Sequence, residues 1–205
     1  MKYFIASDIH GSAFYCDQLI EQFNTSGADK MILLGDILYH GPRNELPLGY
    51  EPKKVIEMLN AIGDKIICVR GNCDSEVDQM VLNFPIMADY AIMPYKNRTI
   101  FITHGHVYGQ EAYDGYAELQ AAYKNKLIKT APKPLPKLNE GDILLHGHTH
   151  VCVCTTISGG IIYINPGSVS IPKEGTSNGY MTFEDGIFTR YSLDGCEEVK
   201  FSIEG

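Results

Sequence analysis

Apolar residues along the chain gather in short unbroken runs, and each run ends in glycine or in a polar residue that can bind a metal ion. The clearest run covers residues 31–34 and leads directly into Gly35 and Asp36. Four apolar residues in succession, without polar alternation, predict a strand that is buried on both faces. Gly35 then allows a sharp turn, which leaves Asp36 at the carboxyl end of the strand. Similar runs predict further strands over residues 2–7, 65–69, 98–103 and 142–145.

Helical spacing appears between these runs. It predicts one helix over residues 13–23 and another over residues 52–62, with Gly63 placed to end the second. The apolar face of the first consists of Phe14, Leu19, Ile20 and Phe23. The apolar face of the second consists of Val55, Ile56, Leu59 and Ile62.

A third, shorter helix is expected after Ser75, because serine is a good N-terminal cap. Its apolar residues Val77, Met80 and Val81 are expected to face inward. From residue 161 onward the pattern indicates antiparallel strands, with turn signals at residues 165–167, 185–186 and 194–195. The chain is therefore predicted to be an α/β protein, a sandwich of mixed sheets with helices outside.

Residues 111–139 are predicted to be a helical insertion within a single domain that covers residues 1–205. Tyr116, Leu119, Tyr123 and Leu127 form a helical stripe, and Pro132, Pro134 and Pro136 then require an extended return. We interpret the stripe as a surface helix packed on its own domain. A substrate cap and a contact between subunits are the alternatives, so a homo-oligomer is possible.

The composition narrows the class of protein. A length of 205 residues with 44% hydrophobic content suits one sizeable core. The formal net charge of −8 disfavours a nucleic-acid polymer as partner. The first apolar run is too short for a signal peptide, and no later run has membrane-spanning length, so we expect a cytoplasmic protein without a membrane partner. Its six cysteines are then expected to be reduced. Cys152 and Cys154, on one face of a strand, are read as small buried hydrophobes rather than soft metal ligands.

Seven residues that follow the apolar runs carry the chemistry. A mixed set of oxygen and nitrogen ligands suits a first-row divalent ion such as manganese, iron or zinc. Seven ligands are too many for one such ion, but they suffice for two if a carboxylate bridges, and Asp36 on the central strand is the best candidate. Two divalent ions against two carboxylates and one hydroxide leave a net positive charge that attracts a phosphate. The seven are Asp8, His10, Asp36, Asn72, His104, His148 and His150.

The order of these motifs resembles that of the calcineurin-like metallophosphoesterases. The matching motifs are Asp8-x-His10, Gly35-Asp36, Gly71-Asn72, His104 and Gly147-His148-x-His150. The resemblance implies a four-layer α/β/β/α sandwich. It also implies a metal-dependent phosphodiesterase that binds two divalent ions, with manganese expected and zinc, iron or nickel as alternatives. One ion would be held by Asp8, His10, Asp36 and His150, and the other by Asp36, Asn72, His104 and His148.

The implied reaction is attack of a metal-bridging hydroxide on a small phosphodiester, in line with the leaving oxygen. Asp36, Asn72, His104 and Cys73, the last as candidate proton donor, are the catalytic residues that this mechanism implies. Many relatives carry histidine directly after the motif asparagine, where it can protonate the leaving group, but this chain has Cys73. A thiol with a reference pKa of about 8.5 is a weaker proton donor, so we expect a preference for good leaving groups.

Other polar residues in the same loops have less specific roles. Arg43 and Asn44 are candidate phosphate contacts, although the same residues suit a turn and a surface charge equally well. His40, His106 and His146 are interpreted as supporting or surface residues and not as ligands. The segment between His106 and Asp142 also departs in length from the family pattern, which leaves the substrate range open.

Three other functions remain as alternatives. The main one is a non-catalytic protein-interaction scaffold of the same fold, which would leave an intact cluster of seven ligands unexplained. A DNA nuclease of the same family is disfavoured by the acidic charge. A structural zinc site normally closes four ligands, often cysteines, around one ion, and none of the cysteines here has zinc-finger spacing.

Overall fold

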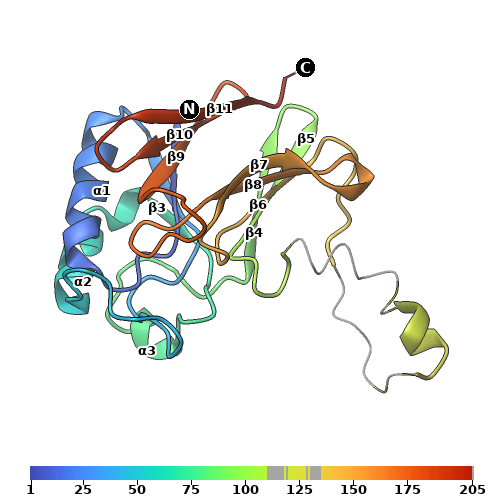
Figure 1. Ribbon diagram of the computed structural model, residues 1–205, viewed down its shortest axis with the longest axis horizontal. Helices are drawn as coiled ribbons and strands as arrows, with labels where there is room; N and C mark the ends of the chain where they lie inside the picture. The colour runs from blue at the N-terminus through green and yellow to red at the C-terminus, as the bar shows by residue number, and fades with distance from the viewer. Residues whose placement is uncertain (110–117, 119, 128, 130–134, 205) are drawn as a thin grey trace.

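Two mixed β-sheets face each other in the computed structural model, which describes residues 1–109, 118, 120–127, 129 and 135–204 (Figure 1). The first sheet has the strand order β11-β10-β9-β1-β2-β3. Its β1, β2 and β3 are parallel, and β9, β10 and β11 extend it in antiparallel fashion. These strands are β1 (Tyr3–Ala6), β2 (Lys30–Leu33), β3 (Ile66–Cys68), β9 (Gly179–Glu184), β10 (Ile187–Ser192) and β11 (Glu197–Ser202).

The second sheet has the order β4-β5-β6-β8-β7. Its central strands β5, β6 and β8 are parallel, and the edge strands β4 and β7 are antiparallel to their neighbours. The edge strand β4 was not predicted from the sequence pattern. The strands are β4 (Tyr90–Tyr95), β5 (Arg98–Thr103), β6 (Ile143–Leu145), β7 (Cys152–Thr156) and β8 (Ile162–Pro166).

The parallel strands are buried on both faces, as their unbroken apolar runs predict. In β1, Phe4 packs toward the helices and the next residue, Ile5, packs between the sheets. On β2, Met31 likewise packs toward the helices and Ile32 packs between the sheets. This alternation builds one core between the sheets and another between the first sheet and the helices. Both cores fix the carboxyl ends of the strands, from which the candidate ligands emerge.

Helices α1 (Ala13–Thr25) and α2 (Pro52–Asn60) cover the outer face of the first sheet (Figure 1). The second helix ends at Asn60, and Gly63 begins the short 3-10 helix η1 (Gly63–Lys65) that leads into β3. Gly63 is therefore not the helix terminator that the spacing indicates. Its small size is needed because a Cβ there would lie 2.2 Å from Asn83 Oδ1.

The outer face of the second sheet is covered differently. Phe101, Leu144 and Tyr163 form a small core there, against which Tyr108 and Leu138 pack. In the part of the chain that the structure describes, no helix lies on this cluster, although the short 3-10 helix η2 (Ser158–Gly160) precedes β8. The fold is thus two mixed sheets with few helices, which agrees with the expected α/β sandwich.

The prediction for the third helix is correct in position and wrong in orientation. Ser75 precedes α3 (Glu76–Gln79), and its backbone N–H and its hydroxyl both donate to Asp78 Oδ2 at 2.8 Å. The helix is only four residues long and projects from the loops below the first sheet (Figure 1). Consequently Val77, Met80 and Val81 do not face inward but are 69%, 83% and 45% exposed.

The predicted insertion is described only in part. Residues 120–124 are helical, and the side chains of Tyr123 and Leu127 are 44% and 78% exposed. Tyr116, Leu119, Pro132 and Pro134 lie outside the described residues. The packing of this stripe on its own domain therefore stays a prediction.

The structure contains neither a disulfide bond nor a membrane-spanning helix among the described residues. All six cysteines are free thiols. Cys152 and Cys154 are half-buried on β7 and pack against the core between the sheets, as small apolar residues do. Among the described residues, no helix has the length and hydropathy needed to cross a membrane.

Candidate metal centre

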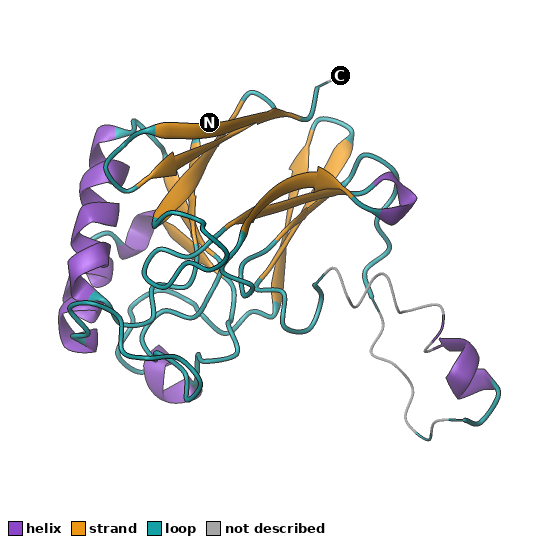
Figure 2. Cartoon of the chain, in the orientation of Figure 1, coloured by secondary structure: helices purple, strands orange, loops and turns teal. Residues whose placement is uncertain are grey.

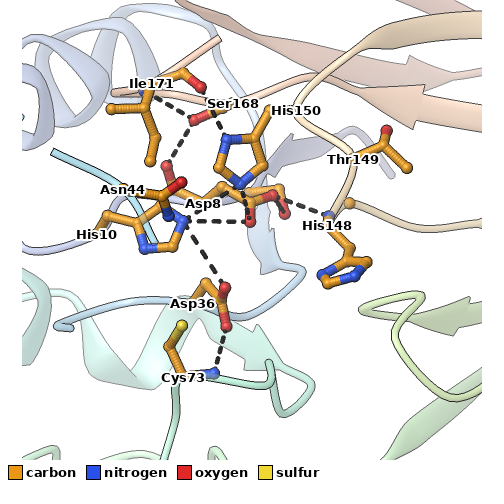
Figure 3. A network of polar contacts seen from close by, with 12 residues as sticks. Asp8, His10, Asp36, Asn44, Cys73, His148, Thr149, His150, Ser168 and Ile171 are labelled. Atoms are coloured by element: carbon orange, nitrogen blue, oxygen red, sulfur yellow. Dashed lines mark hydrogen bonds and ion pairs between the residues drawn. The ribbon is translucent and has the colours of Figure 1, made fainter. Parts of the chain in front are cut away.

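The seven candidate ligands come from distant parts of the sequence and lie on strand-end loops of both sheets, which converge on one side of the molecule (Figure 2). Five of them, Asp8, His10, Asp36, His148 and His150, are seen close together in Figure 3. Parallel strands present their carboxyl ends at the same edge of a sheet, so loops that are far apart in sequence lie side by side there. The ligands follow strands β1, β2, β3, β5 and β6, in the order Asp8 and His10, Asp36, Asn72, His104, and His148 and His150.

Asp8, His10 and His150 form the buried half of the centre. The Nε2 atoms of His10 and His150 lie 3.3 Å apart. Both face Asp8 Oδ1, at 3.6 Å from His10 and 3.1 Å from His150 (Figure 3). The other oxygen, Asp8 Oδ2, accepts the hydroxyl of Ser7 at 2.5 Å and the backbone N–H of His148 at 3.0 Å. One carboxylate oxygen is thus held by the protein and the other is left facing the two imidazoles.

Asn72, His104 and His148 form the open half. His104 Nε2 lies 3.1 Å from Asn72 Oδ1 and 3.2 Å from His148 Nδ1. His104 is fully buried, whereas His148 is half-buried and Asn72 is exposed. Asn72 and His148 therefore meet solvent, whereas His104 is as buried as the three side chains of the buried half.

Asp36 lies between the two halves. Its Oδ2 is 3.7 Å from Nε2 of His10 and 3.5 Å from Nε2 of His104. Its Oδ1 accepts the backbone N–H of Cys73 at 2.8 Å. One carboxylate oxygen thus faces both halves while the other anchors the side chain.

Backbone carbonyls fix the orientation of three of the imidazoles. The Nδ1 atoms lie 2.7 Å from Tyr39 O for His10, 2.8 Å from Ile171 O for His150, and 2.6 Å from Leu34 O for His104. Because a carbonyl can only accept a hydrogen bond, each Nδ1 carries a proton. In the neutral ring the lone pair is then on Nε2, which points into the cluster.

These contacts decide whether the cluster suits a cation. Two lone pairs of His10 and His150 face each other, and Asp8 Oδ1 is buried without a hydrogen-bond partner among the residues that the structure describes. Burial raises the pKa of Asp8, but the hydrogen bonds that His10 and His150 donate to it when their Nε2 atoms are protonated outweigh this and hold its pKa well below the ordinary value. An ionised carboxylate among converging lone pairs is a set of acceptors that lacks a positive charge. The residues therefore fit divalent metal ions, which would supply that charge.

The backbone of the ligand loops adopts a conformation that side chains rarely take. A positive φ is uncommon outside glycine and persists only where surrounding contacts enforce it, often at functional sites. Here the hydrogen bond from His10 N to Asp36 O, at 2.9 Å, is one of the contacts that hold the loops together. The candidate ligands with positive φ are Asp8 (58°), His10 (50°), Asp36 (55°), His148 (67°) and His150 (63°).

Two glycines allow the loops to approach this closely. A Cβ at Gly71 would lie 2.0 Å from Asp36 Oδ1, and a Cβ at Gly147 would lie 1.9 Å from Ser7 Oγ. Both distances are far below van der Waals contact. The Gly-Asn and Gly-His pairs of the motifs therefore have a direct steric cause.

Asp74 positions the loops and was missed as a functional residue by the sequence pattern. Its Oδ2 accepts the backbone N–H groups of Asp36 at 2.9 Å and Gly71 at 2.7 Å, and its Oδ1 accepts that of Ile37 at 2.9 Å. Burial raises its pKa despite these hydrogen bonds. An aspartate two residues after the motif asparagine was the available signal, but two of its three backbone partners, Asp36 and Ile37, lie 38 and 37 residues away and cannot be read from spacing.

The loop after β8 supports the same site from the other side. Ser168 Oγ donates to Asp8 O at 2.8 Å, and Asn165 Nδ2 donates to Gly147 O at 2.8 Å. Both side chains are fully buried. The turn signal at residues 165–167 located this loop, but it did not indicate that the loop holds two ligand segments in place.

A cleft of about 380 Å³ opens onto the cluster. Arg43 and Asn44, the candidate phosphate contacts, line it, and Asn44 Nδ2 also donates to His40 O at 2.8 Å. Lys173 is a second exposed cation in the lining and was not anticipated from the sequence. The remaining lining residues are Asp36, Gly41, Pro42, Asn72, Cys73, His148 and His150.

Cys73 lies at the edge of the cluster. Asn72 Nδ2 donates to its sulfur at 3.2 Å. Burial and the neighbouring Asp36 carboxylate raise the pKa of this thiol well above its ordinary value. The thiol is therefore a weaker acid than a free cysteine, which weakens the case for Cys73 as a proton donor.

The three remaining histidines surround the cluster. Burial lowers the pKa of both His106 and His146 to about 4, with a further contribution to His106 from the neighbouring His104. The His106 ring lies 5.4 Å from that of His104, and the His40 ring packs at 5.3 Å on Tyr50. Only His106 has a ring contact with candidate ligands among the described residues, so the supporting role expected for the three histidines stays a prediction.

Mixed sheets that hold a cluster of histidine, aspartate and asparagine at their strand ends are the architecture of a phosphoesterase fold. The family model described as "Calcineurin-like phosphoesterase superfamily domain" matches residues 1–185, and the chain belongs to this superfamily. Phosphodiesterase YfcE of Escherichia coli strain K12 is 43% identical over 194 residues, which is 95% of this chain and 93% of that protein.

Solved structures agree with this assignment. YfcE from E. coli, described as a phosphoesterase, superposes with a TM-score of 0.84 at 41% identity and covers 100% of both chains. Vps29 from Entamoeba histolytica complexed with zinc has a TM-score of 0.60 at 18% identity and also covers 100% of both chains. An archaeal phosphodiesterase has a TM-score of 0.57 at 21% identity, covering 98% of this chain and 99% of that one. The last two similarities concern the fold alone.

Proposed function

We propose that this chain is a metal-dependent phosphodiesterase with a binuclear centre. The observation that carries the proposal is the position of Asp36, whose Oδ2 faces both His10 and His104 at 3.7 and 3.5 Å. A carboxylate shared between two sets of ligands is the arrangement that holds two ions at the short separation used in phosphate chemistry. The name of the 43% identical relative, a phosphodiesterase, supports the same reaction.

Each half of the centre would hold one ion. Asp8, His10 and His150 with Asp36 would bind one ion, and Asn72, His104 and His148 with Asp36 would bind the other. The mixed oxygen and nitrogen donors suit manganese, with zinc, iron or nickel as alternatives. When bound, the two ions would lower the pKa of the attacking water and neutralise charge on the transferring phosphoryl group.

The residues of the chain orient the reaction. The carbonyls that fix Nδ1 of His10, His150 and His104 keep these rings in one tautomer, so no proton has to move before ligation. Arg43 and Lys173 bring positive charge to the cleft, where they would contact the phosphate oxygens. A cleft of about 380 Å³ suits a small phosphodiester better than a polymer.

Proton donation to the leaving group is the weakest step in this site. The raised pKa of Cys73 makes its thiol a poor acid at neutral pH. The enzyme would therefore prefer aryl esters, whose leaving groups need little protonation, and would act poorly on alkyl monoesters.

The scaffold function of the same fold is the second candidate. The similarity to the zinc-complexed Vps29 structure concerns the fold and does not favour a scaffold function for this chain. The site combines seven competent ligands, converging lone pairs and strained ligand backbones, and each of these lowers the stability of the fold. A scaffold would gain nothing from them. Catalysis accounts for all of them, so it remains the proposal.

The test is hydrolysis of bis(p-nitrophenyl) phosphate and p-nitrophenyl phosphate by metal-stripped protein, with manganese, zinc or magnesium added back. We expect metal-dependent cleavage of the diester, reduced at least about a hundred-fold in Asp36→Asn because both halves lose their shared ligand. Asp185→Asn is the matched control, because Asp185 also has a positive φ, of 48°, but lies in an exposed hairpin. Full metal loading without turnover of either ester would favour the scaffold.

A further inference from the structure

A second hollow, of about 470 Å³, adjoins the catalytic cleft, and Cys73 lines both. Its floor includes Leu38 and Ile56. Leu38 is 5% exposed and belongs to the core between the helices and the first sheet, and Ile56 packs against that core. The floor is therefore rigid and apolar, unlike the polar cleft beside it.

Large apolar side chains that the fold leaves exposed line this groove. Tyr39 and Tyr50 come from the segment between β2 and α2, and Val77 and Val81 come from α3 and the turn after it. Tyr39, Val77 and Val81 are 41%, 69% and 45% exposed. Exposed apolar groups gathered on a concave surface mark a ligand site more often than scattered ones do. The two valines are among the three residues of this segment, with Met80, that the sequence pattern predicts to face inward.

Hydrogen bonds connect the groove to the metal centre. The backbone oxygen of Tyr39 accepts a hydrogen bond from Nδ1 of His10, at 2.7 Å. The backbone N–H of Cys73 donates to Asp36 Oδ1 at 2.8 Å. Tyr39 and Cys73, which both line the groove, are thus fixed relative to both halves of the centre. A group attached to a phosphate at the centre would enter the groove by passing Cys73.

We propose that this groove binds the leaving group of the substrate, and that this group is a flat, uncharged aromatic alcohol. The proposal rests on the phosphodiesterase activity proposed above. In the reaction, the oxygen of water forms a new bond to phosphorus and the bond from phosphorus to the phenolic oxygen breaks. One proton of the water ends on the released phenol, and the other ends on the phosphate monoester, from which it can pass to solvent. The carboxylate of Asp78 also lines the groove. It would repel a leaving group that carries a negative charge of its own, so such a leaving group is disfavoured.

The test compares two diesters that share a methyl ester and differ in the leaving alcohol. Methyl phenyl phosphate has a flat aromatic leaving group, and methyl hexafluoroisopropyl phosphate has a compact one of similar acidity. The variant is the double substitution Val77→Asn and Val81→Asn, which makes the groove polar without adding charge. Val199→Asn is the matched control, since Val199 is 41% exposed and Val81 is 45% exposed.

With manganese bound, we expect the double variant to lose about five-fold or more in kcat/KM for the phenyl ester, because the aromatic ring loses its apolar contacts. The fluoroalkyl ester should change by less than about two-fold, because a compact group fills little of the groove. Val199→Asn should leave both values unchanged. An equal loss for both esters, or no loss for either, would overturn the proposal.

Binding of free phenol separates this proposal from the activity on which it rests. Saturation-transfer NMR should show phenol bound to the metal-free wild type and not to the double variant. Turnover of neither ester would refute the phosphodiesterase, while phenol binding lost in the double variant would still support the groove. Absence of phenol binding to the wild type would overturn it. A smaller oligomer in the double variant than in the wild type would also overturn it, because a second copy of the chain would then be the occupant.

Discussion

The buried and the open halves of the metal centre use similar ligands in different surroundings. In the buried half, His10 and His150 are each oriented by a backbone carbonyl and shielded from solvent. In the open half, His104 is the one ligand with such a carbonyl partner among the described residues, while Asn72 is exposed and His148 is half-buried. Pre-oriented ligands lose less freedom on binding a metal ion. If each half holds one ion, as proposed above, we expect the buried half to bind its ion more tightly and the open half to exchange its ion with solvent.

The largest expected effect is the loss of the ion in the buried half. His10→Ala removes a ligand that is fixed by Tyr39 O and cannot be replaced by solvent in a buried site. We expect diesterase activity to fall at least about a hundred-fold and not to recover with added metal. Metal content per chain, measured by plasma emission spectroscopy, should fall by one ion. Recovery of activity in millimolar manganese would contradict a tightly bound ion in this half.

A smaller effect is expected in the open half. His148→Ala removes a half-buried ligand whose place water can take. We expect metal affinity to fall by about ten-fold to a hundred-fold, with activity restored by excess manganese. The measurement is activity as a function of manganese concentration. If His148→Ala and His10→Ala respond alike to added metal, the two halves do not differ as described.

Substitution of Asp74 tests whether the positioning of the ligand loops affects metal binding in both halves of the centre. Asp74→Asn replaces a carboxylate that accepts three backbone N–H groups with a side chain that has only one acceptor atom. We expect the free energy of unfolding to fall by about 2 kcal/mol, because buried donors lose their partner. Metal affinity should also fall, by about ten-fold, because the loops of Asp36 and Asn72 separate. Denaturant unfolding and metal titration measure the two effects.

Asp142 provides the matched control for this substitution. It is also a buried aspartate, and it accepts the backbone N–H groups of Thr99 and Asn139, both at 2.8 Å, away from the candidate ligands. Asp142→Asn should lower stability to a similar extent and leave metal affinity unchanged. Loss of metal affinity in both variants would mean that Asp74 acts only through overall stability.

The smallest expected effect concerns the side chain beside the open half. Cys73→His places an imidazole next to Asn72, where it can protonate a leaving group better than the thiol does. We expect hydrolysis of esters with poor leaving groups to rise by about ten-fold, with less change for p-nitrophenyl esters. The slope of rate against leaving-group pKa measures this, with Cys196→His on the exposed surface as control. An unchanged slope would show that position 73 takes no part in proton transfer.

Much of the site could be predicted because it depends on local pattern. An apolar run such as residues 31–34 specifies a strand buried on both faces, and the residue that follows it must lie at the strand end. Asp36 and the other six candidate ligands all occupy such positions. Parallel strands then bring these positions together, even though the sequence separates Asp8 from His150 by more than a hundred residues.

Other features depend on contacts that no local pattern encodes. Val77 and Val81 have the spacing of a buried helix face, but α3 is too short to reach the sheet, so both stay exposed. Asp74 owes its role to N–H groups of a loop far away in the sequence. Lys173 reaches the cleft only because the chain after β8 folds back over His150, whose O accepts the N–H of Lys173 at 3.0 Å. Tertiary packing decided all three positions.

Manganese titration followed by electron paramagnetic resonance tests the shared role of Asp36 most directly. The account predicts two ions per chain, with the signal of a magnetically coupled pair at full loading. In Asp36→Asn the coupled signal should disappear, and in the control Asp185→Asn it should persist. One isolated ion per chain in the wild type, or a coupled pair that survives in Asp36→Asn, would contradict a centre built around Asp36.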